Sequence, residues 1–308
     1  MRDSLEVSRI AGAAHLFRTD TGRFPADETD PPMATADAPA VVARQRFPRQ
    51  NRALRKALLG AAGIAGFLLT WQLIPTLGLI NPAFFPPASE VLGRLALDTL
   101  DLEFWRNIGR TLTAWAIGLV IAVALATVLG TVIGLVPFLR RATHTTVEFL
   151  RPIPSVALIP LAILMFGIQL QAALVIIVFA SFWQVFVQVL YGVADIDTVA
   201  RDTARSFGLT PASRLWNLVL PTALPYLMTG VRLAAAVALI LAVTAEMTIG
   251  NPGLGRAIIF AQSAGDYVQL YALVIVTGIL GILINGVFSL IERRALRWHQ
   301  SVRGEDVL

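Results

Sequence analysis

Side chains that could carry out covalent or metal chemistry are scarce in this chain. It has no cysteine, its only lysine is Lys56, and its histidines, His15, His144 and His299, lack the spacing of metal ligands. The sequence contains no G-x-x-x-x-G-K-[ST] motif for ATP phosphates, and no Ser, His and Asp arrangement suggests a nucleophilic site. These features argue against an enzyme and predict that the chain itself holds no cofactor and no metal.

The most informative polar residues lie in one short segment, residues 197–221. Asp197 can accept hydrogen bonds from the free N–H groups of a following helix, and Gly208 is placed to end that helix in a left-handed conformation. Thr210 stands before a proline and predicts a second helix start, and Pro221 is expected to stop this second helix. The segment therefore predicts a helix–turn–helix elbow whose apolar side chains are available to a groove on a protein partner.

The composition around this elbow is that of a membrane protein. Of the 308 residues, 56% are hydrophobic and 15% are charged, and the mean hydropathy is +0.69. A soluble domain of this size could not bury so much apolar surface, and a helix needs about 20 apolar residues to cross a bilayer. The apolar runs predict an all-α membrane protein with six transmembrane helices, near residues 57–80, 111–136, 149–166, 172–193, 226–247 and 268–291.

Prolines, glycines and cap residues divide these apolar runs. Pro152 and Pro154 lie in the third span, where they would kink or break a helix. Between the first two spans, Ser89 resembles the N-cap of a helix over residues 90–102 that lies in the membrane interface. Residues 250–255 contain three glycines and a proline and predict a turn after the fifth span.

The two ends of the chain and the loop charges predict an orientation. Residues 1–50 lack apolar periodicity and predict a disordered cytoplasmic tail, residues 51–300 form the transmembrane domain, and residues 301–308 form a C-terminal tail. Fifteen basic residues lie in the N-terminal flank, the second and fourth loops and the C-terminal tail, against four in the other loops. Because basic residues favour the cytoplasmic side, both termini and the elbow are predicted to be cytoplasmic, and the basicity implies no nucleic-acid partner.

The elbow resembles the cytoplasmic signature of ABC importer permeases: Glu-Ala-Ala, three residues, Gly, nine residues, Ile-x-Leu-Pro. The spacing is intact, with Asp for Glu, Thr for Ala and Leu for Ile, and the matching residues are Asp202, Thr203, Ala204, Gly208, Leu218, Leu220 and Pro221. The resemblance covers roughly residues 57–300. Further matches to the branch that serves nitrate, sulfonates and taurine are at 151–155, 230–233, 245–247 and 253–255.

This resemblance implies a fold, a function and a set of partners. The fold is that of a type I ABC importer permease, and the function is to form the translocation pathway for a small solute, such as a nitrate-, sulfonate- or taurine-like anion. The signature residues would couple the chain to a separate cytoplasmic ATPase subunit, which binds ATP and Mg²⁺. An extracytoplasmic binding protein would deliver the substrate, and two copies of the chain would form a homodimer in the lipid of the bacterial inner membrane.

A few residues inside the spans are candidates for the pathway or a gate. Glu246 lies near the outer end of the fifth span, where it is either a structural partner for a nearby donor or part of the pathway. Gln184 and Gln188 are spaced i, i+4 on one face of the fourth span and would line either a helix contact or a substrate path. Met165 and Phe166 are candidates for a hydrophobic gate.

Two other functions are compatible with a protein of several spans. An ion-coupled secondary carrier would need acidic residues at mid-membrane depth or two repeated halves, and the sequence shows neither. A structural scaffold would transport nothing. The sequence favours the ABC permease, because neither alternative gives the elbow and its spacing a role.

Overall fold

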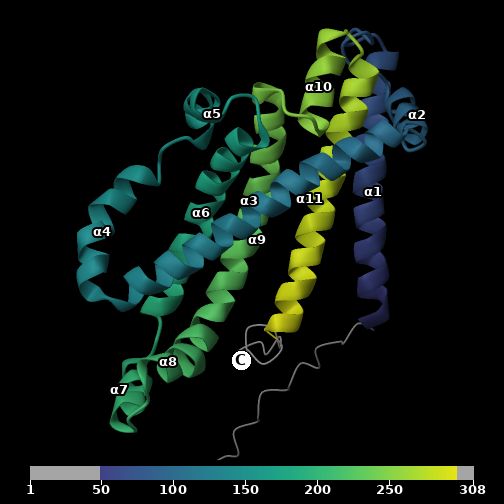
Figure 1. Cartoon of the computed structure of the whole chain (residues 1–308). Coiled ribbons are helices and arrows are strands. Elements are labelled where there is room, and N and C mark those ends of the chain that lie inside the picture. The colour runs from purple at the N-terminus through teal and green to yellow at the C-terminus, as the bar shows by residue number, and fades with distance from the viewer. Residues whose placement is uncertain (1–48, 297–308) are drawn as a thin grey trace, which may run out of the picture. The chain divides into compact units, whose positions relative to one another are not determined.

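The computed structural model describes residues 49–296, and every regular element in that range is helical (Figure 1). The chain divides into two units, Met1–Ala57 and Leu58–Leu308, and the helices from α2 onward belong to the second unit. The predicted N-terminal tail lies outside the described residues except for its last two, with which the first helix begins. The predicted C-terminal tail also lies outside them.

Eleven α-helices form the described part of the chain. They are α1 (Arg49–Thr76), α2 (Ala88–Asp98), α3 (Leu102–Leu135), α4 (Pro137–Leu150), α5 (Ile159–Phe166), α6 (Leu170–Ala194), α7 (Thr198–Ser206), α8 (Pro211–Arg214), α9 (Leu220–Ile249), α10 (Leu254–Ser263) and α11 (Tyr267–Ala295). A 3₁₀ turn (Ser155–Leu158) precedes α5, and a π-helical turn (Leu215–Val219) joins α8 to α9.

Five helical stretches are long and apolar enough to cross a bilayer, and a sixth is counted if one bent pair of helices is a single span. The predicted fourth and sixth spans match α6 and α11 to within four residues, and the apolar part of α1, Leu58–Thr76, ends four residues before the predicted end of the first span. The second span begins earlier than predicted, at Leu102, because the Asp101 side chain caps α3 by accepting a hydrogen bond from the Glu103 N–H at 3.0 Å. The membrane class expected from the composition therefore agrees with the lengths of the helices.

The third predicted span, 149–166, is not one continuous helix. The apolar run is divided between α4 and α5, which with the 3₁₀ turn are bent by 84°. Pro152 and Pro154 stand in the break, where a proline removes a backbone donor and clashes with the preceding turn. The expectation that these prolines break the span is confirmed.

The predicted interface helix exists, but with different ends and a different cap. It is α2, which starts after Pro87 and ends at Asp98, so that Ser89 is inside its first turn instead of capping it. The backbone N–H of Ser89 donates to the side-chain oxygen of Gln72 on α1 at 2.9 Å. A partner on another helix therefore takes the place of a local cap.

The core is built around α6, which packs most extensively against α9 and α3 (Figure 1). Small residues let these helices approach closely, as is usual for helices in membranes. A side chain at Gly118 of α3 would come within 2.5 Å of Ile177, and one at Gly230 of α9 would come within 3.1 Å of the Val185 Cα. This tight centre packs α9 closely against α3 and α6.

Candidate functional site

The elbow predicted at residues 197–221 is present, and its two caps form as expected. The Asp197 carboxylate accepts a hydrogen bond from the Val199 N–H at 2.8 Å and so caps α7. The Thr210 hydroxyl accepts one from the Ser213 N–H at 3.2 Å and caps α8. These side chains satisfy backbone donors that have no partner inside their helices.

The turn between the two arms depends on Gly208. Its φ of +67° is left-handed, a conformation that costs other residues energy. The Gly208 N–H donates to the Arg205 carbonyl at 2.9 Å, and the Leu209 N–H donates to the Ala204 carbonyl at 3.1 Å. This pair of bonds is a Schellman motif, which closes the end of α7. Ala204 and Gly208, two of the predicted coupling residues, therefore shape the turn through their backbones.

The second arm of the elbow does not stop at Pro221, contrary to the prediction. Helix continues from Pro211 to Ile249, through the π-helical turn and into α9. At this turn the Leu220 N–H donates to the Leu215 carbonyl, five residues back, and Pro221 then occupies the first turn of α9, where its missing N–H is tolerated. The elbow is therefore joined directly to a membrane-spanning helix.

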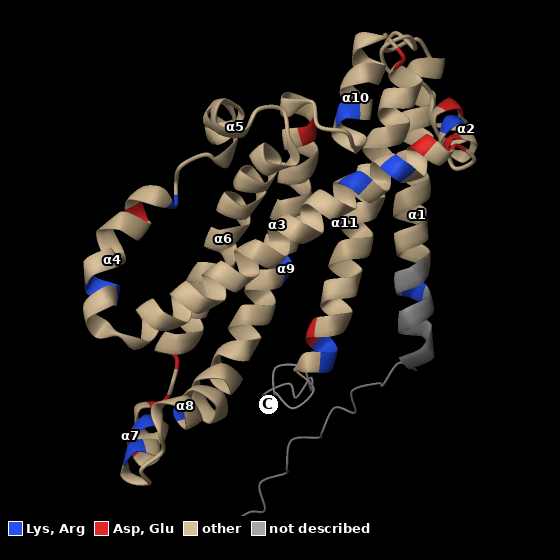
Figure 2. Ribbon diagram, viewed as in Figure 1, with Lys and Arg blue, Asp and Glu red and all other residues tan. Residues whose placement is uncertain are grey.

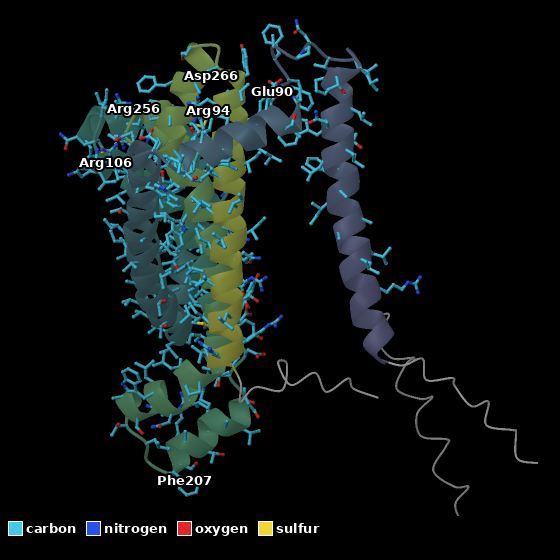
Figure 3. The ribbon with its side chains drawn as sticks, turned by 90° about the vertical axis from the view of Figure 1, so that its right-hand side faces the viewer. Glu90, Arg94, Arg106, Phe207, Arg256 and Asp266 are labelled. Carbon is cyan, nitrogen blue, oxygen red and sulfur yellow. The ribbon has the colours of Figure 1, made fainter. Side chains whose placement is uncertain are left out.

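The tip of the elbow carries an exposed aromatic side chain. Phe207 is 81% exposed there, and Trp216, in the π-helical turn where the elbow joins α9, is 69% exposed. Figure 3 shows Phe207 at the end of the elbow, pointing away from the long helices. Asp202 is also exposed and forms only a loose ion pair with Arg205, at 3.7 Å. This surface offers an aromatic anchor and an acidic group to a protein partner.

The seven predicted coupling residues do not share one surface. Two groups can be distinguished: the first lies at or near the tip and the second lies half-buried at the start of α9. The first group is Asp202, Thr203, Ala204 and Gly208, and the second is Leu218, Leu220 and Pro221. The tip group is accessible to a partner, whereas the second group joins the elbow to the spans.

A polar contact at the base of the elbow was not predicted from the sequence. The Tyr226 hydroxyl of α9 donates to the Asp195 carboxylate at the end of α6, at 2.9 Å. The two residues are 31 positions apart, and no motif in the sequence connects them. This bond links the end of α6 to α9 on either side of the elbow.

At the other end of α9, Glu246 is held in a buried hydrogen-bond network. The Thr111 hydroxyl of α3 and the Gly255 N–H of α10 both donate to Glu246 Oε2, each at 2.9 Å. The Leu254 N–H donates in turn to the Thr111 hydroxyl at 3.0 Å. Glu246 and Thr111 therefore cap α10 from two other helices, which supports the structural alternative for Glu246.

A cavity of about 620 Å³ lies beside this network. Its wall includes Glu246, the amide side chains of Gln169 and Asn251, and two arginines of α3, Arg106 and Arg110. Figure 3 places Arg106 at the end of the unit opposite to Phe207. These arginines were not predicted as site residues, although their i, i+4 spacing at the start of an apolar span places them on one face of α3.

The other pathway candidates lie in two different settings. Gln184 and Gln188 are half-buried on α6, and Gln188 Cβ would lie 3.0 Å from a side chain at Gly230, so this face packs against α9. Met165 is 65% exposed and Phe166 is 39% exposed at the end of α5. The pathway and gate roles of these four residues remain predictions.

Comparison with known proteins gives one protein family and several similar permeases. Residues 118–297 match the family described as binding-protein-dependent transport system inner membrane component. The chain is 31% identical over 257 residues to the taurine transport system permease protein of Escherichia coli (strain K12), covering 81% of this chain and 92% of the relative. It is 30% identical over 250 residues to a bicarbonate transport system permease protein of Synechococcus elongatus, covering 78% and 90%.

Solved structures resemble the fold. An amino acid ABC transporter crystallised with histidines matches with a TM-score of 0.54 at 18% identity, covering 65% of this chain and 97% of that chain. An inward-facing methionine ABC transporter also matches with a TM-score of 0.54, at 22% identity, covering 61% and 94%. The helical architecture is therefore that of a type I ABC importer permease.

Proposed function

Because the chain belongs to the family of binding-protein-dependent transport system inner membrane components, we propose that its elbow transmits the motion of an ATPase to a pathway for a small anion. The chain is a permease subunit of an ABC importer, a transport component and not an enzyme. It spans the membrane several times and works with an ATPase and a substrate-binding protein. Its relatives are not secondary carriers or scaffolds, so the comparisons decide against both alternatives.

The coupling role is supported mainly by one observation: the elbow has an exposed tip, and hydrogen bonds fix its shape. The Schellman turn and the caps fix the shape of the elbow, and its second arm runs on into α9. A force on the tip is therefore applied to a helix that crosses the membrane. ATP binding would close two ATPase subunits and draw two elbows together, and hydrolysis would release them. Such a cycle is a shift between two populated states, driven by the difference in nucleotide affinity.

The proposed substrate is a small organic or inorganic anion. The relatives are permeases of transport systems for taurine, aliphatic sulfonates and bicarbonate. Arg106 and Arg110 line the cavity beside Glu246, but both form ion pairs with Glu103, at 3.7 and 2.9 Å, so the proposed class rests on the relatives and not on the charge of the cavity. The Glu246 carboxylate accepts bonds from Thr111 and Gly255, which leaves its charge partly compensated. We place this cavity on the extracytoplasmic side and both termini in the cytoplasm, following the loop charges.

The coupling role is tested with the complete importer in proteoliposomes. Gly208→Val forces a β-branched residue into a left-handed conformation, which costs about 1–2 kcal/mol and lowers the population of the correct turn about ten-fold. Asp202→Lys reverses the exposed charge of the tip. Both variants are expected to remain in the membrane while losing substrate-stimulated ATPase activity and uptake.

Gly265→Val is the matched control, because Gly265 has a φ of +74° and equally open surroundings but lies in the turn before α11. It introduces a similar strain far from the elbow and is expected to leave the coupling of ATPase activity to uptake unchanged. If the elbow variants kept full substrate-stimulated ATPase activity, the coupling role would be wrong, whatever the substrate. The same assay gives the substrate class when the cognate binding protein is loaded with sulfonates, bicarbonate or neutral solutes.

A further inference from the structure

A second, smaller cavity lies between the elbow and the long helices. Its volume is about 280 Å³, just below the usual range for ligand pockets, which starts at about 300 Å³. Three arginines line it, Arg201 and Arg205 from α7 and Arg214 from α8, and its lining contains no acidic residue. The rest of the wall is mainly aliphatic, including Leu135 and Leu218. Figure 2 shows the basic residues gathered on α7 and α8.

The positive charge in this cavity is poorly compensated within residues 49–296. Arg214 Nε is inaccessible to solvent and has no hydrogen-bond partner there. Arg201 forms no ion pair with any described residue, and Arg205 has only the loose, exposed contact with Asp202. A buried N–H group without an acceptor is unusual in a folded protein and indicates a missing partner. That partner must supply acceptor oxygens, and three guanidinium groups favour an anionic one.

The position of the cavity indicates where this partner comes from. Leu135 is the last residue of α3, and Ile196 follows α6 by two positions. The cavity is therefore level with the ends of two apolar spans, where the hydrocarbon of a bilayer gives way to the headgroups. The tip of the elbow with Phe207 points away from the long helices (Figure 3), whereas the cavity is lined by the ends of those helices, so an ATPase seated on the tip would contact a different part of the elbow.

We propose that this cavity binds the phosphate of an anionic phospholipid headgroup. The guanidinium groups would hold the phosphate oxygens through paired hydrogen bonds, and the aliphatic wall would contact the glycerol backbone and the first methylene groups. Such a lipid would fasten the elbow to the membrane surface beside α3 and α6. Inorganic phosphate shares the same recognition chemistry, and the experiment separates the two sources.

The test uses the full chain purified from membranes and measures bound lipid by native mass spectrometry. Phosphatidylglycerol is added in competition with phosphatidylethanolamine. The wild-type chain is expected to retain phosphatidylglycerol selectively, and Arg201→Gln with Arg214→Gln is expected to weaken it by about five-fold for each arginine removed. Arg201→Lys with Arg214→Lys keeps the charge but loses the paired hydrogen bonds, and an intermediate affinity is expected.

The matched control is Arg140→Gln with Arg141→Gln, two exposed basic residues of α4 outside the cavity lining. This control is expected to bind lipid as the wild type does, and equal thermal unfolding of all variants shows that each is folded. Equal retention of phosphatidylglycerol by the cavity and control variants would overturn the proposal. It would also be overturned if millimolar inorganic phosphate displaced the lipid and stabilised the lipid-free chain equally well. If the cavity variant no longer bound the ATPase but bound lipid as the wild type does, the arginines would contact the ATPase instead of a lipid.

Discussion

At the residue scale, Glu246 shows how a charged group can be placed inside a membrane span. The residue is 2% exposed, and its Oε2 atom accepts hydrogen bonds from one hydroxyl and one backbone N–H. The sequence predicted the depth of this residue in the fifth span. It could not predict its partners, because Thr111 lies 135 positions away and Gly255 donates through its backbone, which any residue possesses.

Glu246→Ala is expected to destabilise the chain. It leaves the buried Gly255 N–H and the Thr111 hydroxyl without their acceptor, at a cost of about 1–3 kcal/mol for each group. Glu246→Gln keeps an oxygen that can accept both bonds and is expected to retain most of the stability. The measurement is the apparent melting temperature in detergent. If Glu246→Ala melted like the wild type, the capping role would be wrong, and if stable Glu246→Gln lost uptake, Glu246 would have a role in the pathway.

A second prediction concerns Gly255, which belongs to the same hydrogen-bond network as Glu246. A Cβ at this position would collide with the Val243 carbonyl oxygen and lie 2.8 Å from Glu246 Cβ, so Gly255→Ala is expected to separate α10 from α9 and lower the melting temperature. Gly93→Ala is the matched control, since Gly93 is also helical but has open space around it. Alanine there is expected to be neutral or to stabilise by about 0.5–1 kcal/mol. Similar behaviour of the two variants would show that close packing at Gly255 is unimportant.

At the element scale, local sequence signals predicted where helices begin and turn better than they predicted whether a helix continues past a proline. Asp197, Gly208 and Thr210 cap the elbow as predicted, because each acts on neighbours within a few residues. Pro221 did not stop its helix, since the π-helical turn before it shifts the hydrogen bonds. The break in the third span was visible in its prolines, but its 84° angle depends on packing that a sequence does not show.

The bent pair α4 and α5 is expected to cross the membrane once. The chain contains no cysteine, so single cysteines can be labelled without any background. Thr145→Cys on α4 and Gln171→Cys at the start of α6 are exposed positions on either side of the break. A maleimide that cannot cross membranes is expected to label Gln171→Cys in cells with a permeable outer membrane, and Thr145→Cys only after the inner membrane is opened. Labelling of both from the same side would indicate a re-entrant loop instead.

At the scale of the whole molecule, the orientation of the spans stays a prediction from loop charge, whereas the number of helical stretches able to cross a bilayer followed from the composition. The order in which the spans pack did not, because α3, α6 and α9 are apolar on all sides and differ from α1 and α11 mainly in their small contact residues. Lipid tails and helix surfaces are equally apolar, so hydrophobicity alone cannot identify the central helices. The two arginines of the outer cavity were missed for a related reason, since a cavity is a property of several helices together.

In a single chain, the gate expected at the end of α5 has no second surface facing it. Met165 is 65% exposed at the end of α5, and a hydrophobic gate needs a second wall. In a two-fold symmetric dimer, a residue near the axis faces its own copy. Met165→Cys is therefore expected to form dimers with a short bismaleimide in membranes, most strongly when ATP is absent and the pathway is closed to the outside.

Ile282→Cys on α11 is the matched control. Ile282 is 74% exposed, but α11 is among the least buried of the spans and is expected to face lipid. Equal cross-linking at both positions, or none at Met165→Cys, would contradict a paired gate at α5.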